Sequence, residues 1–209
     1  MLDALVATLG AGESGRWQRL RFPADRRRHL AARGWSRRVL GAALGLAPEA
    51  VPLAHAPGKP VLEGPAGAVV HFNLSHAGDL AVIAVARQPV GIDVEPVDAG
   101  HLLADAAGVF CTRAELARLD QLTAPGRADA LVRWWTAKEA CLKAVGSGLA
   151  VDPRTVELEW GPGRSSAAAR VAGRRWRVRT VPLVPGHVVA VAAPGGWVPR
   201  CRRVEELAP

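Results

Sequence analysis

Two acidic residues at alternate positions of a short apolar run, Asp93 and Glu95, have the spacing of a metal site. They lie in the run Gly91-Ile92-Asp93-Val94-Glu95-Pro96. Because side chains alternate along a strand, the two carboxylates share one face, and the apolar residues take the other. At a spacing of about 7 Å, two carboxylates can converge on a hard cation such as Mg²⁺. Taken alone, the same pair is more typical of solvated acids at the end of a strand.

A second group lies in residues 135–143, where Glu139 and Lys143 are four residues apart. On a helix these side chains are neighbours on one face, in the orientation that favours an ion pair. An ordinary surface pair would have the same spacing. However, tryptophan and aliphatic residues flank this pair, which predicts that the helix packs closely against another element.

Three further positions offer groups for binding an anion. Ser75 and His76 present a hydroxyl and an imidazole, although local turn hydrogen bonds explain a serine there equally well. A hydrolase dyad does not fit, because the two residues are adjacent and no G-x-S-x-G pattern is present. Lys59 stands in Gly58-Lys59-Pro60 without the rest of a phosphate-binding P-loop. Arginines 26–28 belong to a basic helix, for which a solvated face is the alternative.

Arginine supplies most of the positive charge of this chain. The 209 residues include 27 Lys and Arg against 19 Asp and Glu, which gives a net charge of +8. This balance suits an acidic partner such as nucleic acid, an anionic cofactor or an acidic protein, but a general drift towards arginine would give the same charge. The chain has just three lysines, Lys59, Lys138 and Lys143. Their positions are informative, because an ammonium differs from a guanidinium in hydration and geometry.

The overall composition narrows the class of protein. Hydrophobic residues make up 49% and charged residues 22% of the chain, which excludes general disorder. No apolar run approaches the roughly 18 residues that span a bilayer, and the first residues lack the basic region of a signal peptide. Three widely spaced cysteines form neither a metal spacing nor a disulfide framework. We therefore expect a cytoplasmic protein.

Hydrophobic periodicity predicts helices, then strands, then helices, then strands again. A long amphipathic helix is expected over 13–46, with Asp25 as its cap and Arg33 and Arg37 on its polar side. The proline-rich residues 47–68 are expected to be loop. Strands are expected at 69–75, 80–86, 90–95, 155–160, 168–171, 175–181 and 187–193. The first three of these are expected to form an antiparallel meander. Further helices are expected at 100–108, 112–122 and 126–145. This order predicts an α+β protein with helices packed on antiparallel sheets, in which one helix-plus-meander unit occurs twice.

In this order along the chain, the segments resemble the Sfp-type 4′-phosphopantetheinyl transferases. The matching segments are Gly58-Lys59-Pro60, Phe72-Asn73-Leu74-Ser75-His76, Gly91-Ile92-Asp93-Val94-Glu95, Phe110 with Glu115, and Trp135 to Lys143 with Gly146-Ser147-Gly148-Leu149. The resemblance runs from about residue 25 to residue 187, and 91–95 and 135–149 are its most specific parts. All three lysines lie inside these motifs.

The resemblance implies an enzyme that transfers phosphopantetheine from coenzyme A to a serine of an apo acyl or peptidyl carrier protein and releases 3′,5′-ADP. Such enzymes activate carriers of polyketide and nonribosomal peptide biosynthesis. The implied cofactor is Mg²⁺, with Mn²⁺ as the alternative. The implied partner is an acidic carrier protein, with no nucleic acid and no membrane, and the protein is expected to be a monomer.

The implied fold is α+β with two similar lobes related by pseudo-twofold symmetry, each an antiparallel sheet packed by helices. Residues 1–95 would bind the 3′-phosphate and adenine side of coenzyme A. Residues 96–209 would provide the metal, pyrophosphate and carrier-protein side.

The resemblance also assigns roles to individual residues. Asp93, Glu95 and Glu139 would hold the metal, and Asp93, Glu139 and Lys143 would carry the catalysis. Glu139 would be a metal ligand, the base for the serine hydroxyl, or both. Lys143 would neutralise pyrophosphate charge. The other contacts to coenzyme A would come from Arg28, Ser75 and His76 at the 3′-phosphate, from Lys59 at the adenine, and from Lys138 at a phosphate or the pantetheine.

Two assignments around Phe110 stay open. Glu115 would be a further acid near the metal. On the helix that follows Phe110, Arg113 and Arg118 with exposed parts of Leu116 and Leu119 are candidate contacts for the carrier protein, and plain core packing is the alternative.

Two other functions remain as alternatives. The charge of +8 fits a nucleic-acid-binding protein, but no helix-turn-helix, zinc or aromatic RNA motif is present. The chain could also dock carrier proteins without catalysis, but its intact acids and lysines argue against that.

Overall fold

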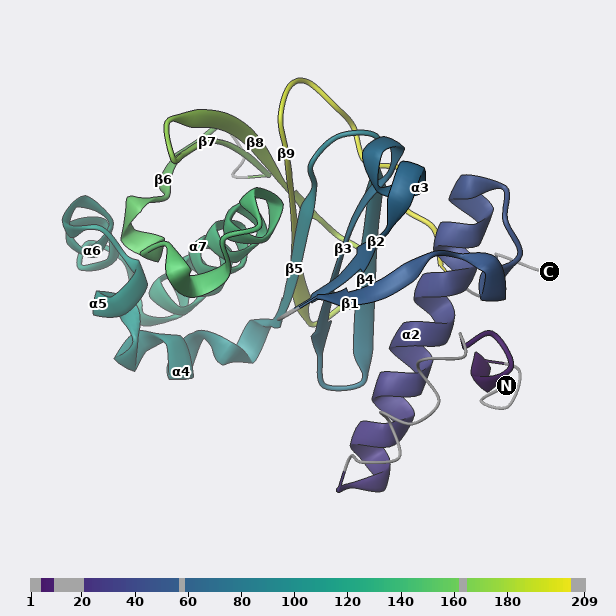
Figure 1. Cartoon of the computed structure of the whole chain (residues 1–209). Coiled ribbons are helices and arrows are strands. Elements are labelled where there is room, and N and C mark those ends of the chain that lie inside the picture. Colours follow the sequence, from purple (N-terminus) through teal and green to yellow (C-terminus); the bar gives the residue numbers. More distant parts are fainter. Residues whose placement is uncertain (1–4, 10–20, 57–58, 162–164, 204–209) are drawn as a thin grey trace. The chain divides into compact units, whose positions relative to one another are not determined.

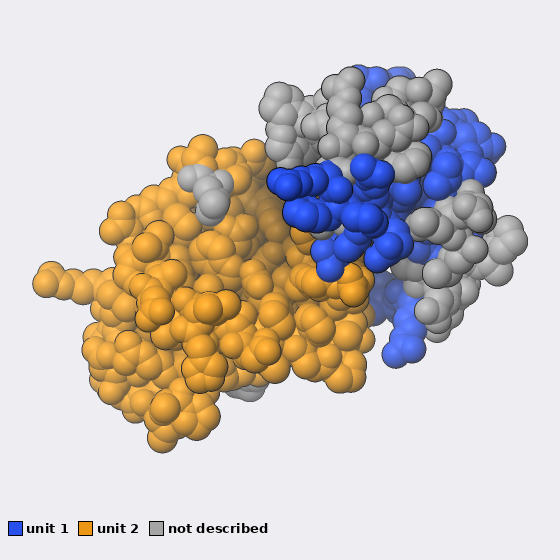
Figure 2. Space-filling model, turned by 90° about the horizontal axis from the view of Figure 1, so that it is seen from below, with its two compact units in different colours: residues 1–71, 200–209 blue, residues 72–199 orange. Residues whose placement is uncertain are grey.

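The structure is a computed structural model that describes residues 5–9, 21–56, 59–161 and 165–203. The chain divides into two compact units, residues 1–71 with 200–209 and residues 72–199 (Figure 2). The α+β class predicted from the sequence is confirmed, because helices pack beside antiparallel sheets. The division into lobes at residue 95 and their pseudo-twofold relation stay predictions.

The unit of residues 1–71 and 200–209 is built on the long helix α2 (Pro23–Leu44). This helix begins with Pro23 after an extended Phe22, and it ends at Gly45, whose φ of 68° favours glycine. The predicted cap, Asp25, is instead the third residue of the helix. Residues 13–20 of the predicted helix lie outside the described part of the chain.

The polar side predicted for α2 is partly wrong. Arg33 and Arg37 are buried rather than solvated. The Nη1 group of Arg37 donates hydrogen bonds to the carbonyl oxygens of Pro48, Glu49 and Val51, at 3.0, 3.3 and 2.9 Å. The guanidinium therefore holds the segment that follows the helix.

Residues 47–68 are not only loop, as the prolines had indicated. Strands β1 (Leu53–Ala56) and β2 (Lys59–Leu62) form an antiparallel pair, and the short helix α3 (Gly64–Val69) follows. The prediction is wrong because a two-stranded sheet leaves an outer edge on each strand, where proline is tolerated. Pro65 occupies the first turn of α3, where its missing N–H costs nothing.

The second unit contains two sheets. Strands β3 (His71–Ala77) and β4 (Leu80–Ala86) form one, and five antiparallel strands form the other. The five-stranded sheet has the order β5 (Gly91–Pro96), β9 (His187–Ala193), β8 (Arg174–Val181), β7 (Ser166–Val171) and β6 (Glu157–Trp160). The seven strands expected from the sequence are thus present. The expected meander is not, because β5 pairs with the distant β9 instead of β4.

Four helices connect the two sets of strands. They are α4 (Gly100–Asp105), α5 (Ala107–Phe110), α6 (Arg113–Leu119) and α7 (Ala124–Val145). A capping box between Thr112 and Glu115 starts α6, and Gly146 ends α7 with a φ of 81°. None of the helices in the described ranges is long and apolar enough to cross a membrane.

Helix α7 lies along the five-stranded sheet beside β5 and β9 (Figure 1). Buried residues of its second half, from Ala137 to Ala144, form one core cluster with inward-facing residues of β6 to β9, including Trp176. At Gly91 the backbone of β5 approaches α7 so closely that a Cβ atom would lie 2.0 Å from the carbonyl oxygen of Ala140. Glycine therefore allows the acidic strand to lie directly against this helix.

Candidate functional site

Strand β5 and helix α7 position the acidic residues. On β5, Ile92 and Val94 belong to a core cluster with Val82 and Val189. Asp93 and Glu95 alternate with them and line a cavity together with residues of α7. The alternation predicted from the sequence is therefore confirmed, and its polar face is turned towards the helix.

The cavity has a volume of about 320 Å³ and is formed by three segments that are far apart in the sequence. Its lining residues are Leu74, Ser75 and His76 of β3, Asp93, Val94 and Glu95 of β5, and Trp135, Glu139 and Lys143 of α7. The structure thus brings six of the predicted site residues into one place. All of them lie in the unit of residues 72–199.

The side chain of Asp93 is the most highly connected group of this cavity. The ammonium of Lys143 lies 2.6 Å from Asp93 Oδ1, and the hydroxyl of Ser75 donates to the same oxygen at 2.8 Å. Lys143 also donates to Ser75 Oγ at 3.0 Å. Asp93 is only 3% exposed, so these contacts offset part of the cost of burying its charge.

Trp135 also lines this cavity, and sequence reasoning assigned it no role in the site. Its indole Nε1 donates a hydrogen bond to Glu95 Oε1 at 3.0 Å. The signal was present in the spacing, because residues 135, 139 and 143 are successive i, i+4 positions on one face of a helix. The large apolar ring indicates core packing from the sequence alone, which conceals its use as a hydrogen-bond donor.

The carboxyl groups of the cavity oppose one another's ionisation. Burial raises the pKa of Asp93, against the lowering effect of Lys143 and of the hydrogen bond from Ser75. Burial also raises the pKa of Glu95 and that of Glu139, and the negative charge of Asp93 raises both further. Lys143 lowers the pKa of all three groups. The cavity therefore concentrates negative charge that one lysine does not fully balance.

The chemistry of these oxygen atoms suits a hard cation. Asp93 Oδ2 and Glu139 Oε1 are buried and have no hydrogen-bond partner among the described residues. Carboxylate oxygens are the ligands that Mg²⁺ and Mn²⁺ take most readily. In the described part of the chain, no three His, Cys, Asp or Glu side chains are already gathered closely enough to hold a metal. The residues thus fit a metal by the type of their donor atoms and by the cavity that they share. In this structure the ammonium of Lys143 contacts Asp93 instead.

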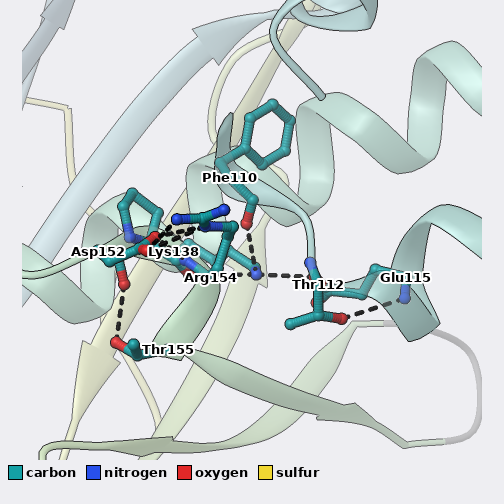
Figure 3. A network of polar contacts seen from close by, with 8 residues as sticks. Phe110, Thr112, Glu115, Lys138, Asp152, Arg154 and Thr155 are labelled. Atoms are coloured by element: carbon teal, nitrogen blue, oxygen red, sulfur yellow. Dashed lines mark hydrogen bonds and ion pairs between the residues drawn. The ribbon is translucent and has the colours of Figure 1, made fainter. Parts of the chain in front are cut away.

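Lys138 does not reach this cavity, contrary to the contact with coenzyme A assigned to it. Its side chain is completely buried, and Nζ donates to Phe110 O at 2.8 Å, Glu115 Oε2 at 2.8 Å and Pro153 O at 3.2 Å (Figure 3). An ammonium has three donors, and all three are used here. It has none left for a phosphate, so this assignment is corrected.

Glu115 likewise does not line the acidic cavity. Its Oε2 atom accepts from Lys138 and, at 2.7 Å, from the backbone N–H of Thr112 (Figure 3). Its carboxylate therefore caps α6 and pairs with Lys138. On the same helix Leu119 is fully buried and Leu116 packs against its cluster, so core packing describes these two side chains.

The two remaining predicted contacts lie in the other unit. Arg28 stands on α2, where it is exposed, and Lys59 is the first residue of β2. Both belong to the unit of residues 1–71 and 200–209, and their assignments to coenzyme A stay predictions.

Comparison with known proteins places this chain in a family. Residues 89–192 match the family profile of the 4′-phosphopantetheinyl transferase superfamily, and residues 1–88 match that of the 4′-phosphopantetheinyl transferase N-terminal region. The 4′-phosphopantetheinyl transferase HetI of Nostoc sp. is 37% identical over 206 residues, which cover 95% of this chain and 84% of that protein. A 4′-phosphopantetheinyl transferase of Bacillus subtilis is 30% identical over 150 residues, which cover 71% of this chain and 65% of that protein.

These matches define an enzyme class, the transferases of the phosphopantetheine group. The chain belongs to the 4′-phosphopantetheinyl transferase superfamily, as the motifs had indicated. Among solved structures, a holo-(acyl-carrier-protein) synthase from Bacillus anthracis in complex with CoA (3′,5′-ADP) matches with a TM-score of 0.44 and 19% identity. That match covers 50% of this chain and 92% of the synthase.

Proposed function

We propose that this protein transfers the 4′-phosphopantetheine group of coenzyme A to a serine hydroxyl of an apo carrier protein, giving the holo carrier and 3′,5′-ADP. The observation that carries the proposal is the single cavity that contains Asp93, Glu95, Glu139 and Lys143. The hydroxyl attacks the β-phosphorus of the pyrophosphate, a new P–O bond forms, and the bond to the 3′,5′-ADP oxygen breaks. The reaction needs a set of charges that binds a pyrophosphate and a group that accepts a proton.

Asp93, Glu95 and Glu139 would hold Mg²⁺, with Mn²⁺ as an alternative. When bound, the cation supplies Lewis-acid stabilisation of charge on the phosphoryl oxygens. The support for this assignment is the donor set itself, three carboxyl groups on one cavity, with two buried oxygen atoms that have no partner among the described residues.

Lys143 would neutralise the charge of the pyrophosphate, and Glu139 would accept the proton or help to bind the metal. Lys143 is a partly exposed cation at the cavity wall, so it can exchange its contact with Asp93 for one with a pyrophosphate oxygen. Glu139 would accept the proton of the serine hydroxyl, directly or through water, or bind the metal, or do both. Its raised pKa is in keeping with a base, because proton transfer is efficient when the pKa of the acceptor approaches the operating pH.

The rest of coenzyme A would extend from this cavity. His76 lines its wall, is exposed and would reach the 3′-phosphate. Ser75 would join it after its buried hydroxyl, which donates its one hydrogen to Asp93 Oδ1, gives up that contact. Arg28 would contact the same phosphate, and Lys59 the adenine. The acceptor would be an acidic acyl or peptidyl carrier protein, which suits the net charge of +8.

The test is a transfer assay with coenzyme A, Mg²⁺ and a panel of apo carrier proteins, read as the gain of one phosphopantetheine in the mass of the carrier. We expect transfer by the wild type and a loss of about 100-fold or more in Asp93→Asn and in Glu139→Gln. Glu159→Gln, an exposed acid of β6 outside the cavity, is the matched control and should keep full activity. Full activity in both cavity variants would refute the site, and no transfer to any carrier would refute the function.

A further inference from the structure

Glu95 and Asp93 are held in two chemically different ways. Asp93 contacts a cation, Lys143, which partly cancels its charge. Glu95 accepts instead from the neutral indole N–H of Trp135 at 3.0 Å. A neutral donor fixes the direction of a carboxylate and leaves its full negative charge available. The hydrogen bond uses Oε1, so Oε2 remains available to a cation in the cavity that Glu95 lines.

The indole ring is itself fixed from behind. The ring of Phe110 meets that of Trp135 edge to face, with centroids 5.1 Å apart and an interplanar angle of 61°. Phe110 is 1% exposed, and its carbonyl oxygen accepts from the buried Lys138 (Figure 3). Lys138 pairs in turn with Glu115, which caps α6. A continuous row of contacts thus runs from this buried ion pair through Phe110 and Trp135 to Glu95.

We propose that Trp135 is a positioning residue of the metal site, which orients the Glu95 carboxylate through its indole N–H and is itself held by Phe110. The inference rests on the proposed function, because it requires that Glu95 is a metal ligand. A hydrogen bond that orients a ligand from outside the metal site is typically worth 10- to 100-fold in metal affinity or activity. A purely structural tryptophan would alter stability and leave the metal affinity unchanged.

The decisive variant is Trp135→Phe, which keeps an aromatic ring against Phe110 and removes the N–H donor. Trp134→Phe is the matched control, because Trp134 is the next residue of α7, packs in the Phe110 cluster, and makes no hydrogen bond from its indole to the described residues. Both variants are compared by thermal unfolding, so that a general loosening of the core is recognised.

Two measurements report on the metal. Binding of Mn²⁺ is titrated by electron paramagnetic resonance of the free ion in the presence of coenzyme A, and transfer to an apo carrier is measured as a function of Mg²⁺ concentration. We expect Trp135→Phe to weaken Mn²⁺ binding about tenfold, and to raise the half-saturating Mg²⁺ concentration by a similar factor. The kcat at saturating Mg²⁺ should largely recover, and Trp134→Phe should match the wild type in both measurements.

Unchanged Mn²⁺ binding and Mg²⁺ dependence in Trp135→Phe would overturn the inference, as would an equal loss in Trp134→Phe. In both cases a wild type that transfers leaves the proposed function standing. A wild type that neither binds Mn²⁺ nor transfers phosphopantetheine would overturn the proposed function, and the inference with it.

Discussion

Lys143 is the residue on which the charge balance of the cavity depends. Its ammonium fits between Asp93 Oδ1 at 2.6 Å and Ser75 Oγ at 3.0 Å, contacts that suit a compact donor better than a planar guanidinium. We expect Lys143→Met to lower kcat of phosphopantetheine transfer by about 100- to 1,000-fold. Lys143→Arg should recover only part of this loss, because the charge returns without the geometry. Steady-state kinetics with one apo carrier measures both, and full activity in Lys143→Arg would show that charge alone is required.

Glu139 should reveal the cost of its burial through the pH dependence of stability. Its folded-state pKa is raised, so the folded protein binds more protons than the unfolded chain at pH values above the ordinary glutamate value. Ionisation of Glu139 therefore lowers the free energy of unfolding as pH rises through the raised pKa. The neutral Glu139→Gln does not carry this cost.

We expect metal-free Glu139→Gln to match the wild type near pH 4 and to melt about 2–4 °C higher near pH 7.5, the shift that roughly 1 kcal/mol gives in a chain of this size. The measurement is thermal unfolding in a chelator at a series of pH values. A difference that is largest at low pH would contradict the sign of the raised pKa.

At the scale of elements, the Lys138–Glu115 pair joins α7 to α5, α6 and the segment of Pro153. A buried pair contributes little over an apolar replacement, but removing one partner leaves an unpaired buried charge, which costs about 3–5 kcal/mol. We expect Lys138→Met to lose that much stability in urea unfolding. The double variant Lys138→Met with Glu115→Gln should lose less than the sum of the single variants, because no charge is left unpaired. Strictly additive losses would mean that the two side chains are not coupled.

The sequence predicted the parts of this site that depend on local periodicity. The alternation of 91–96 placed Asp93 and Glu95 on one face, and the i, i+4 spacing placed Glu139 with Lys143. The partners of Lys138 could not be predicted. Its position about 100° around the helix from Glu139 shows that the two side chains point in different directions, but it does not identify the residues that Lys138 contacts. The pairing of β5 with β9 was also hidden, because strand partners about a hundred residues apart leave no local signal.

At the scale of the whole molecule, the charge of +8 bears on how a carrier protein arrives. Favourable long-range charge raises the rate of encounter, and salt screens it. We expect kcat/KM for an acidic apo carrier to fall about tenfold between about 50 mM and about 500 mM NaCl. Because coenzyme A is also an anion, it is kept saturating, and its own affinity is measured at each salt concentration.

A carrier whose acidic helix has been neutralised is the control for this experiment. Its kcat/KM should start lower and change little with salt, because the charges that steer the wild-type carrier are missing. If the excess arginine is compositional drift with no bearing on the partner, both carriers will show the same slope. Equal slopes would thus assign the charge of this protein to its composition rather than to its function.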